Sequence, residues 1–173
     1  KTMDERKGLS AKNILVIVIV LILFVGGFFV TSHLTGSVKL STSEDLTAAL
    51  QQAVMSEQAP EVYKTDLTDR CLAVLFDAGD QKNDLVLFVP DWLFPDRWCY
   101  LDAMQSEDDV AVYHTRVGTE EEPKTLVVVF GQSDHDVTVT AGDHQETISP
   151  DKNGIVLKQF RVAGNVTPVL TEN

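Results

Sequence analysis

The chain has 173 residues, and its 26 acidic and 14 basic side chains give a formal charge of −12. This length accommodates one ordinary domain in addition to an anchoring segment. The acidic balance argues against nucleic acid as a partner, because phosphates would be repelled. Since the chain begins at Lys1, either Met3 is its start or further sequence precedes it.

Residues 14–30 carry neither a charge nor a hydrogen-bonding side chain. As a helix this run would be about 25 Å long, and extending it to Leu34 brings it near the roughly 30 Å of a bilayer's hydrocarbon core. We therefore predict a transmembrane anchor over residues 14–34, with the lipid bilayer as its surroundings. A buried core helix and a cleaved signal peptide are the alternatives, but signal peptides have a shorter apolar region of about 7–15 residues.

Charge is distributed unevenly on the two sides of this anchor. Residues 1–13 hold four basic and two acidic side chains, whereas residues 31–173 hold 10 basic and 24 acidic ones. Basic residues beside a membrane helix tend to stay in the cytoplasm. We therefore predict a single-pass protein of the cell membrane, with residues 1–13 as a cytoplasmic basic segment and the C-terminal domain outside.

A polar linker is predicted over residues 35–42, followed by an amphipathic helix over residues 43–58. Ser43 is one candidate N-cap, and Ser41 with Glu44 in a capping box is the other. Pro60 would end this helix. Its apolar residues recur with helical spacing and form one stripe, made of Leu46, Ala49, Leu50, Ala53 and Val54.

Beyond this helix the apolar pattern changes to the period of β-strands. The predicted strands are residues 71–77, 85–89, 98–104, 110–116, 125–130, 137–140, 144–148 and 155–162. Turns are expected at residues 78–84, 141–143 and 153–154. Because strands do not alternate with helices, the pattern predicts a mainly antiparallel β domain over residues 43–162, sandwich-like or an open barrel and α+β in class, with one leading helix. Residues 163–173 are predicted to be a loosely held tail.

Residues 88–100 have the most unusual local composition of the chain, since both tryptophans lie there among other aromatic side chains and two prolines. Aromatic and arginine side chains supply much of the binding energy at interfaces. The candidate binding residues are Trp92, Phe94, Arg97, Trp98 and Tyr100, and the candidate partner is an envelope protein or a carbohydrate. The alternative is a long loop whose aromatic side chains cap the core.

Cys71 and Cys99 are the two cysteines of the chain. Outside the cell membrane, in an oxidising compartment, they are expected to form a disulfide that ties the aromatic segment to the sheet. Two reduced, buried thiols are the alternative. A nucleophile pair of Cys99 with His114 has no supporting motif.

Residues 134–136 and 143–144 bring aspartate and histidine to the two ends of the strand predicted over residues 137–140. A strand of four residues is about 13 Å long, which is too far for the two groups to share a metal ion. We expect solvated turn residues there, with no metal site and no cofactor. The sequence also lacks the common hydrolase, zinc-protease, P-loop, dinucleotide-binding and EF-hand motifs, so no catalytic residue is assigned.

A basic start, an apolar helix and a β domain resemble the layout of type IV pilin-like proteins, which implies a structural subunit. That family has a glutamate early in the apolar helix and continues the helix into the globular domain. Residues 14–30 contain no glutamate, and the polar residues 31–42 interrupt the helix. We therefore expect a membrane-anchored extracytoplasmic binding or interaction module of the cell envelope, with an envelope hydrolase and a pilin-like subunit as the alternatives.

Overall fold

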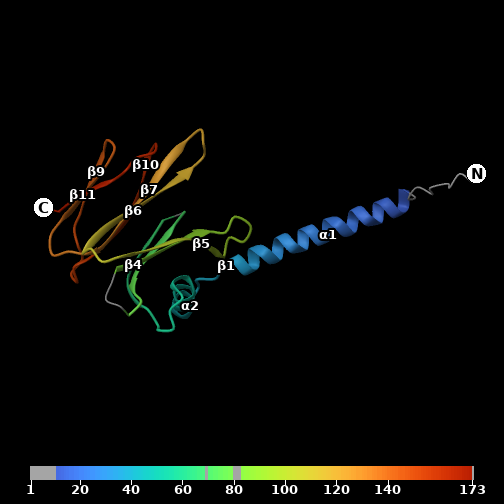
Figure 1. Cartoon of the computed structure of the whole chain (residues 1–173), viewed down its shortest axis with the longest axis horizontal. Helices are drawn as coiled ribbons and strands as arrows, with labels where there is room; N and C mark the ends of the chain where they lie inside the picture. Colours follow the sequence, from blue (N-terminus) through green and yellow to red (C-terminus); the bar gives the residue numbers. More distant parts are fainter. Residues whose placement is uncertain (1–10, 69, 80–82, 173) are drawn as a thin grey trace, which may run out of the picture. The chain divides into compact units, whose positions relative to one another are not determined.

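The structure is a computed structural model that describes residues 11–68, 70–79 and 83–172 (Figure 1). Most of the predicted cytoplasmic segment therefore lies outside the described residues. The chain divides into two compact units, of which the first ends at Ser37 and the second begins at Val38. Helix α1, Ala11–Gly36, makes up the described part of the first unit apart from Ser37.

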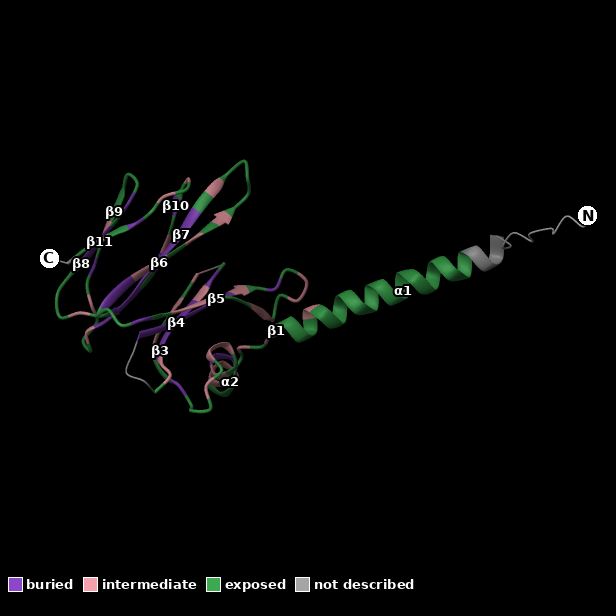
Figure 2. Cartoon of the chain, viewed as in Figure 1, coloured by how far each residue is buried: buried purple, intermediate pink, exposed green. Residues whose placement is uncertain are grey.

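Within the described residues, α1 is the one helix long and apolar enough to cross a membrane, over Leu15–Gly36. These 22 residues form a helix about 33 Å long, which is compatible with a single-pass membrane protein. From Leu15 to Gly36 its residues are exposed, apart from the half-buried His33 (Figure 2), and Phe24 reaches 74% exposure. The Thr31 hydroxyl donates to the Gly27 carbonyl oxygen at 2.8 Å, so this polar group is satisfied inside the helix.

The remaining described residues form helix α2 and eleven strands, most of them in antiparallel pairs. Their bounds are β1 (Ser37–Val38), α2 (Ser43–Val54), β2 (Glu61–Leu67), β3 (Leu72–Asp77), β4 (Asn83–Pro90), β5 (Trp98–Ser106), β6 (Val110–Gly118), β7 (Pro123–Gln132), β8 (Val137–Ala141), β9 (His144–Ile148), β10 (Ile155–Ala163) and β11 (Val169–Glu172). The prediction of a mainly antiparallel β domain is confirmed. Three sheets result, with the strand orders β1-β5-β4-β3-β2, β10-β7-β6 and β11-β8-β9.

The five-stranded sheet and the sheet β10-β7-β6 face each other across an inner core. Its buried members are Cys71, Ala73, Leu75, Leu85, Leu87, Ala111, Leu126, Val128, Phe130, Ile155 and Leu157. At one edge the Gln159 backbone N–H donates to Asp66 Oδ2 at 2.9 Å and joins β10 to β2. At the other edge the Tyr113 hydroxyl donates to Asp102 Oδ2 at 2.7 Å and joins β6 to β5. The two sheets thus curl toward each other like the halves of a barrel, with side chains linking both edges.

Each of these sheets is covered on its outer face as well. Helix α2 places Leu50 against Val74 and Phe88 of the five-stranded sheet. The sheet β11-β8-β9 places Val137 and Val139, among others, against the outer face of β10-β7-β6. Both faces of the central strands are therefore buried, which explains why β3, β4 and β7 appear in the sequence as solid apolar runs.

Helix α2 begins and ends differently from the prediction. Its N-cap is Thr42, whose side chain accepts from the Asp45 backbone N–H at 3.1 Å, while the Asp45 carboxylate accepts from the Thr42 N–H at 3.0 Å. This is a capping box one residue before the predicted Ser43 cap. The helix ends at Val54 because Met55 adopts a left-handed conformation with φ of 53°, several residues before Pro60.

Strands β1, β2 and β11 were not predicted. Strand β2 sends few side chains inward, so its sequence lacks a clear apolar alternation. The predicted loose tail is wrong in part, because Val169–Glu172 pairs with β8 and the Gly164 carbonyl oxygen accepts from the Thr125 hydroxyl at 2.8 Å. Part of the turn predicted over residues 78–84 lies outside the described residues.

Candidate functional site

The segment between β4 and β5, residues 91–97, is held in one conformation by Asp91 and is here called the aromatic loop. Asp91 is buried, with 3% exposure, and its Oδ1 accepts from the backbone N–H groups of Leu93 at 2.7 Å and Phe94 at 3.1 Å. An aspartate that bonds the backbone two residues ahead is a common turn-forming device. The Asp91 N–H also donates to the Arg97 carbonyl oxygen at 2.9 Å and closes the loop.

The predicted disulfide is not formed, because Cys71 and Cys99 are both free thiols. Strand β4 lies between them: Leu72 pairs with Phe88 on one side of β4, and Cys99 pairs with Val89 on the other. Two strand spacings amount to about 10 Å, whereas the Cα atoms of a disulfide lie within about 7 Å. The restraint expected from a disulfide comes instead from Asp91, to whose Oδ2 the Cys99 thiol donates at 3.4 Å.

The five candidate binding residues divide into exposed and packed ones. Trp92 is 72% exposed and Tyr100 is 48% exposed, so both present large aromatic faces to the surroundings. Phe94 and Arg97 are half-buried. Trp98 packs against the outer core beneath α2, so its role is at least partly structural. The aromatic loop therefore combines a packed base with an exposed tip at Trp92.

Lys39 adds a basic group that the sequence did not connect with the aromatic loop. Its Nζ lies 3.0 Å from Asp96 Oδ2, and this contact lowers the pKa of the exposed Asp96 carboxyl. Lys39 thereby offsets the negative charge of Asp96 at the end of the aromatic loop. Asp91 itself could have been suspected from the Pro-Asp-Trp-Leu-Phe-Pro sequence, since aspartate after proline favours a turn.

The geometry does not support a Cys–His nucleophile. Burial raises the pKa of the Cys99 thiol, and the hydrogen bond to Asp91 raises it further. A protonated thiol is a weak nucleophile. His114 lies exposed on β6, and its neighbour Tyr113 packs against the inner core, so the alternation of a strand directs His114 to the opposite face.

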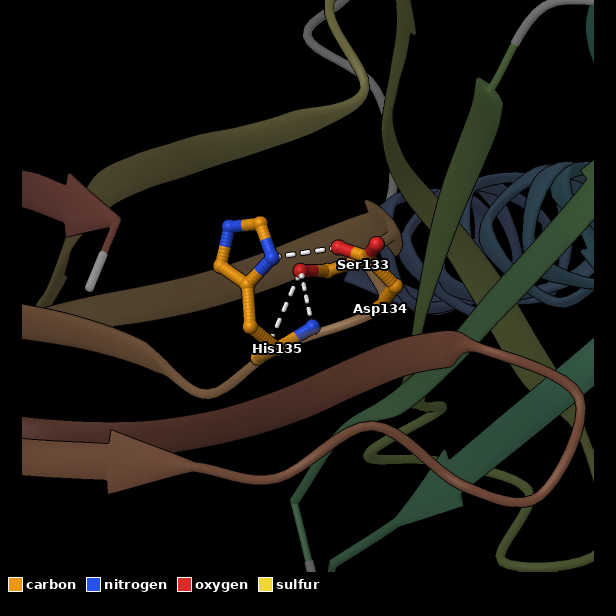
Figure 3. Close-up of polar contacts among 3 residues, drawn as sticks. All are labelled: Ser133, Asp134 and His135. Atoms are coloured by element: carbon orange, nitrogen blue, oxygen red, sulfur yellow. Dashed lines mark hydrogen bonds and ion pairs between the residues drawn. The ribbon is translucent and has the colours of Figure 1, made fainter.

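A shallow hollow of about 600 Å³ lies at the other end of β5. Its lining includes Asp109 with the turn residues 132–135 and 150–154. Figure 3 shows Ser133, Asp134 and His135 at this place. The Ser133 hydroxyl donates to the His135 carbonyl oxygen at 2.8 Å, and the His135 ring pairs with Asp134. Because the serine proton is donated to the backbone and not to the imidazole, these three residues do not form a catalytic triad.

One carboxylate at the hollow, that of Asp151, is held by backbone groups. Asp151 Oδ1 accepts from the N–H groups of Asn153 at 2.9 Å and Ile155 at 3.0 Å, and these bonds lower the pKa of the Asp151 carboxyl. Asp134 is 93% exposed. Strand β8 separates residues 134–136 from residues 143–144. Across the described residues no group of three histidine, cysteine or acidic side chains is placed to hold a metal ion.

Comparisons with protein-family models, with curated proteins and with solved structures find no match for this chain. The chemistry of the two surfaces is therefore the basis for any functional proposal.

Proposed function

We propose that this protein is a membrane-anchored interaction module whose binding surface is the aromatic loop. In this proposal α1 spans the cell membrane once, residues 1–13 lie in the cytoplasm and the β domain lies outside. The charge difference between residues 1–13 and residues 31–173 supports this orientation. The length and exposure of the apolar residues of α1 support the span.

The observation that carries the proposal is the way Asp91 fixes a loop whose tip is exposed. A buried carboxylate that accepts two backbone N–H groups orders the loop before any partner arrives. Ordering a binding segment in advance lowers the entropy cost of binding. Trp92, at 72% exposure, then offers the kind of side chain that dominates interface energies.

The acidic domain makes nucleic acid an unsuitable partner. The exposed aromatic faces suit an amphipathic partner, such as an envelope protein, a carbohydrate or a lipid headgroup layer. The raised pKa of Cys99 counts against the alternative of a thiol hydrolase. No cofactor is part of the proposal.

A photo-crosslinking residue in place of Trp92, in the full chain in its native membrane, tests this function. We expect a discrete adduct from position 92. The matched control is the same replacement at Val169, which is 61% exposed on β11, and we expect no adduct there. Equal or absent adducts at the two positions would contradict the proposal. Filaments containing the chain would favour a pilin-like subunit, and turnover of an envelope polymer would favour a hydrolase.

A further inference from the structure

We infer that the β domain carries a second binding site, a small hollow at Gln159 of β10 that takes an α-amino acid in its zwitterionic form. This site is separate from the aromatic loop, so the inference goes beyond the proposed function and does not depend on it. It follows from a buried acceptor that lacks a donor, from the hollow beside this acceptor and from the charges around it. All of the residues concerned belong to the second compact unit.

The side-chain amide of Gln159 has a fixed orientation. Gln159 is buried, with 4% exposure. Its Nε2 donates to the backbone carbonyl oxygens of Asp66 at 2.6 Å and Cys71 at 3.2 Å. Only the NH₂ end of an amide can donate to a carbonyl oxygen, so the two ends of this amide cannot be exchanged. The Oε1 atom must therefore face away from both carbonyl oxygens.

Gln159 Oε1 is buried and accepts no hydrogen bond from the residues that the structure describes. The hydroxyl of the nearby Thr68 is not available to it, because this hydroxyl donates to the Cys71 carbonyl oxygen at 3.1 Å. A buried acceptor without a donor costs free energy, and native proteins rarely leave one in that state. The Oε1 atom therefore indicates a donor that comes from outside the chain.

A hollow of about 110 Å³, here called the Gln159 hollow, lies beside this amide. It is lined by Thr68, Leu126, Gln159, Phe160 and Arg161. Pockets for cofactors and drug-sized ligands measure about 300–1,000 Å³, so only a molecule of a few non-hydrogen atoms fits here. Because Oε1 itself is buried, a ligand reaches it only when a lining side chain moves, and the exposed Arg161 has the freedom to do so.

The alternation of β10 directs Arg161 to the same side as Gln159. Leu157 packs in the inner core, whereas Phe160 and Val162 pack against the outer one, so the odd-numbered side chains of this strand point inward. Residues two apart in a strand lie about 7 Å from each other. The guanidinium of Arg161 makes no ion pair or hydrogen bond with another described residue, which leaves its charge available to a ligand.

The charges near the amide match those of an amino acid. Asp66 Oδ2 accepts from the Gln159 backbone N–H at 2.9 Å, so a carboxylate lies close to the acceptor that lacks a donor. Beside a carboxylate, a protonated amine is a more favourable donor than a neutral group. A guanidinium such as that of Arg161 binds carboxylates through two parallel hydrogen bonds. A molecule that joins an ammonium group to a carboxylate within a few bonds satisfies both sides, and α-amino acids are the smallest such molecules.

Titration of the full chain in detergent micelles with glycine tests the inference, followed by NMR of isotope-labelled protein. We expect saturable shifts of the Gln159 side-chain amide and of the backbone N–H groups of residues 160 and 161. Acetate keeps the carboxylate but lacks the ammonium group, and its half-saturating concentration should be at least about tenfold higher. Both ligands are compared on the unaltered chain, so this comparison does not depend on the folding of a variant.

A pair of variants then tests the position of the site on β10. Arg161→Gln removes the guanidinium and should raise the half-saturating concentration of glycine about tenfold. The matched control is Lys158→Gln, on the opposite face of the same strand, where Lys158 Nζ lies 3.9 Å from Glu146 Oε1. This control should leave the half-saturating concentration unchanged.

The other outcomes overturn the inference. Without saturable shifts in glycine, Gln159 Oε1 would be the acceptor of a bound water only. Equal half-saturation by acetate and glycine would show that no donor is recognised. Equal weakening by Arg161→Gln and Lys158→Gln would place the binding of glycine outside the Gln159 hollow. None of these results bears on the crosslinking test at Trp92, which decides the proposed interaction module separately.

Discussion

At the scale of single residues, the aromatic loop depends on one buried carboxylate. Asp91 accepts hydrogen bonds from the backbone of Leu93 and Phe94 and from the Cys99 thiol. Hydrogen bonds to a charged acceptor are stronger than those between neutral groups, and a buried donor left without its acceptor is costly. Replacing Asp91 should therefore disorder the aromatic loop more than replacing either tryptophan.

We predict that Asp91→Ala lowers the free energy of unfolding by about 2 kcal/mol, because two backbone N–H groups lose a charged acceptor. Asp91→Asn should cost less, since the amide oxygen can still accept both bonds. Denaturant unfolding of the full chain in detergent measures both changes. The matched control is Asp96→Ala, at an exposed residue of the same loop, which should stay within about 0.5 kcal/mol. Equal losses for Asp91→Ala and Asp96→Ala would contradict this role for Asp91.

Cys71 provides a second prediction at this scale, through the dependence of stability on pH. Its side chain is fully buried, and burial raises the pKa of the thiol from 9.0 to about 11. Between these values the unfolded chain loses the thiol proton while the folded chain retains it, so stability is complete below pH 9 and decreases toward pH 11. A shift of two units corresponds to at most about 2.7 kcal/mol from this one group.

We therefore expect the free energy of unfolding, measured under reducing conditions, to decrease between pH 9 and pH 11. Tyr113 reinforces the decrease, because burial and its bond to Asp102 raise the pKa of that phenol to about 12. In the Cys71→Ala variant the free energy of unfolding should decrease less steeply between pH 9 and pH 11. This comparison of slopes is independent of any stability that the variant loses at neutral pH. A slope identical to that of the unaltered chain would show that Cys71 does not titrate in this way.

At the scale of elements, the cap of α2 shows what local sequence leaves undecided. Residues 41–43 are Ser, Thr and Ser, and each of them can act as an N-cap. The structure selects Thr42 because Asp45, three residues later, returns the bond to its N–H. A capping box needs an acidic or amide side chain three residues after the N-cap. Asp45 stands three residues after Thr42, so recognising this pair would have identified Thr42 as the N-cap.

We predict that Thr42→Ala lowers the free energy of unfolding by about 1 kcal/mol, because the Asp45 N–H loses its acceptor. Ser41→Ala and Ser43→Ala are the matched controls and should each change it by less than about 0.5 kcal/mol. Thermal unfolding followed by circular dichroism measures the three variants together. A larger loss of stability for Ser43→Ala than for Thr42→Ala would indicate that Ser43 is the N-cap, and would contradict the prediction.

The hairpins β3–β4 and β8–β9 were predictable because their apolar pattern and turns are local. Strands β1, β2 and β11 were not predictable in this way. Strand β2 pairs locally with β3 but sends few side chains inward, whereas β1 and β11 are short and pair with strands distant in sequence. The aromatic residues of the candidate site stood out by composition. The role of Asp91 did not, since it depends on burial, and the disulfide was predicted without knowledge that β4 separates the two cysteines.

At the scale of the whole molecule, the chain combines one apolar helix with one layered β domain, and each matches a different solvent. The apolar side chains of α1 are exposed to the surroundings, and lipid is the solvent that suits such a helix. The domain carries the acidic charge and buries its apolar side chains in three cores. Function must therefore be tested with the two parts connected and in a bilayer.

The last prediction concerns which side of the membrane the domain occupies. In a Cys71→Ala, Cys99→Ala background, a cysteine is introduced by Met55→Cys, because Met55 is 93% exposed just after α2. A membrane-impermeant maleimide should label this cysteine in intact cells or spheroplasts, since the proposed orientation places the basic segment 1–13 in the cytoplasm and the β domain outside. The matched variant carries Thr2→Cys instead and should be labelled only after lysis. Labelling of Thr2→Cys in intact cells, with protection of Met55→Cys until lysis, would reverse the proposed orientation.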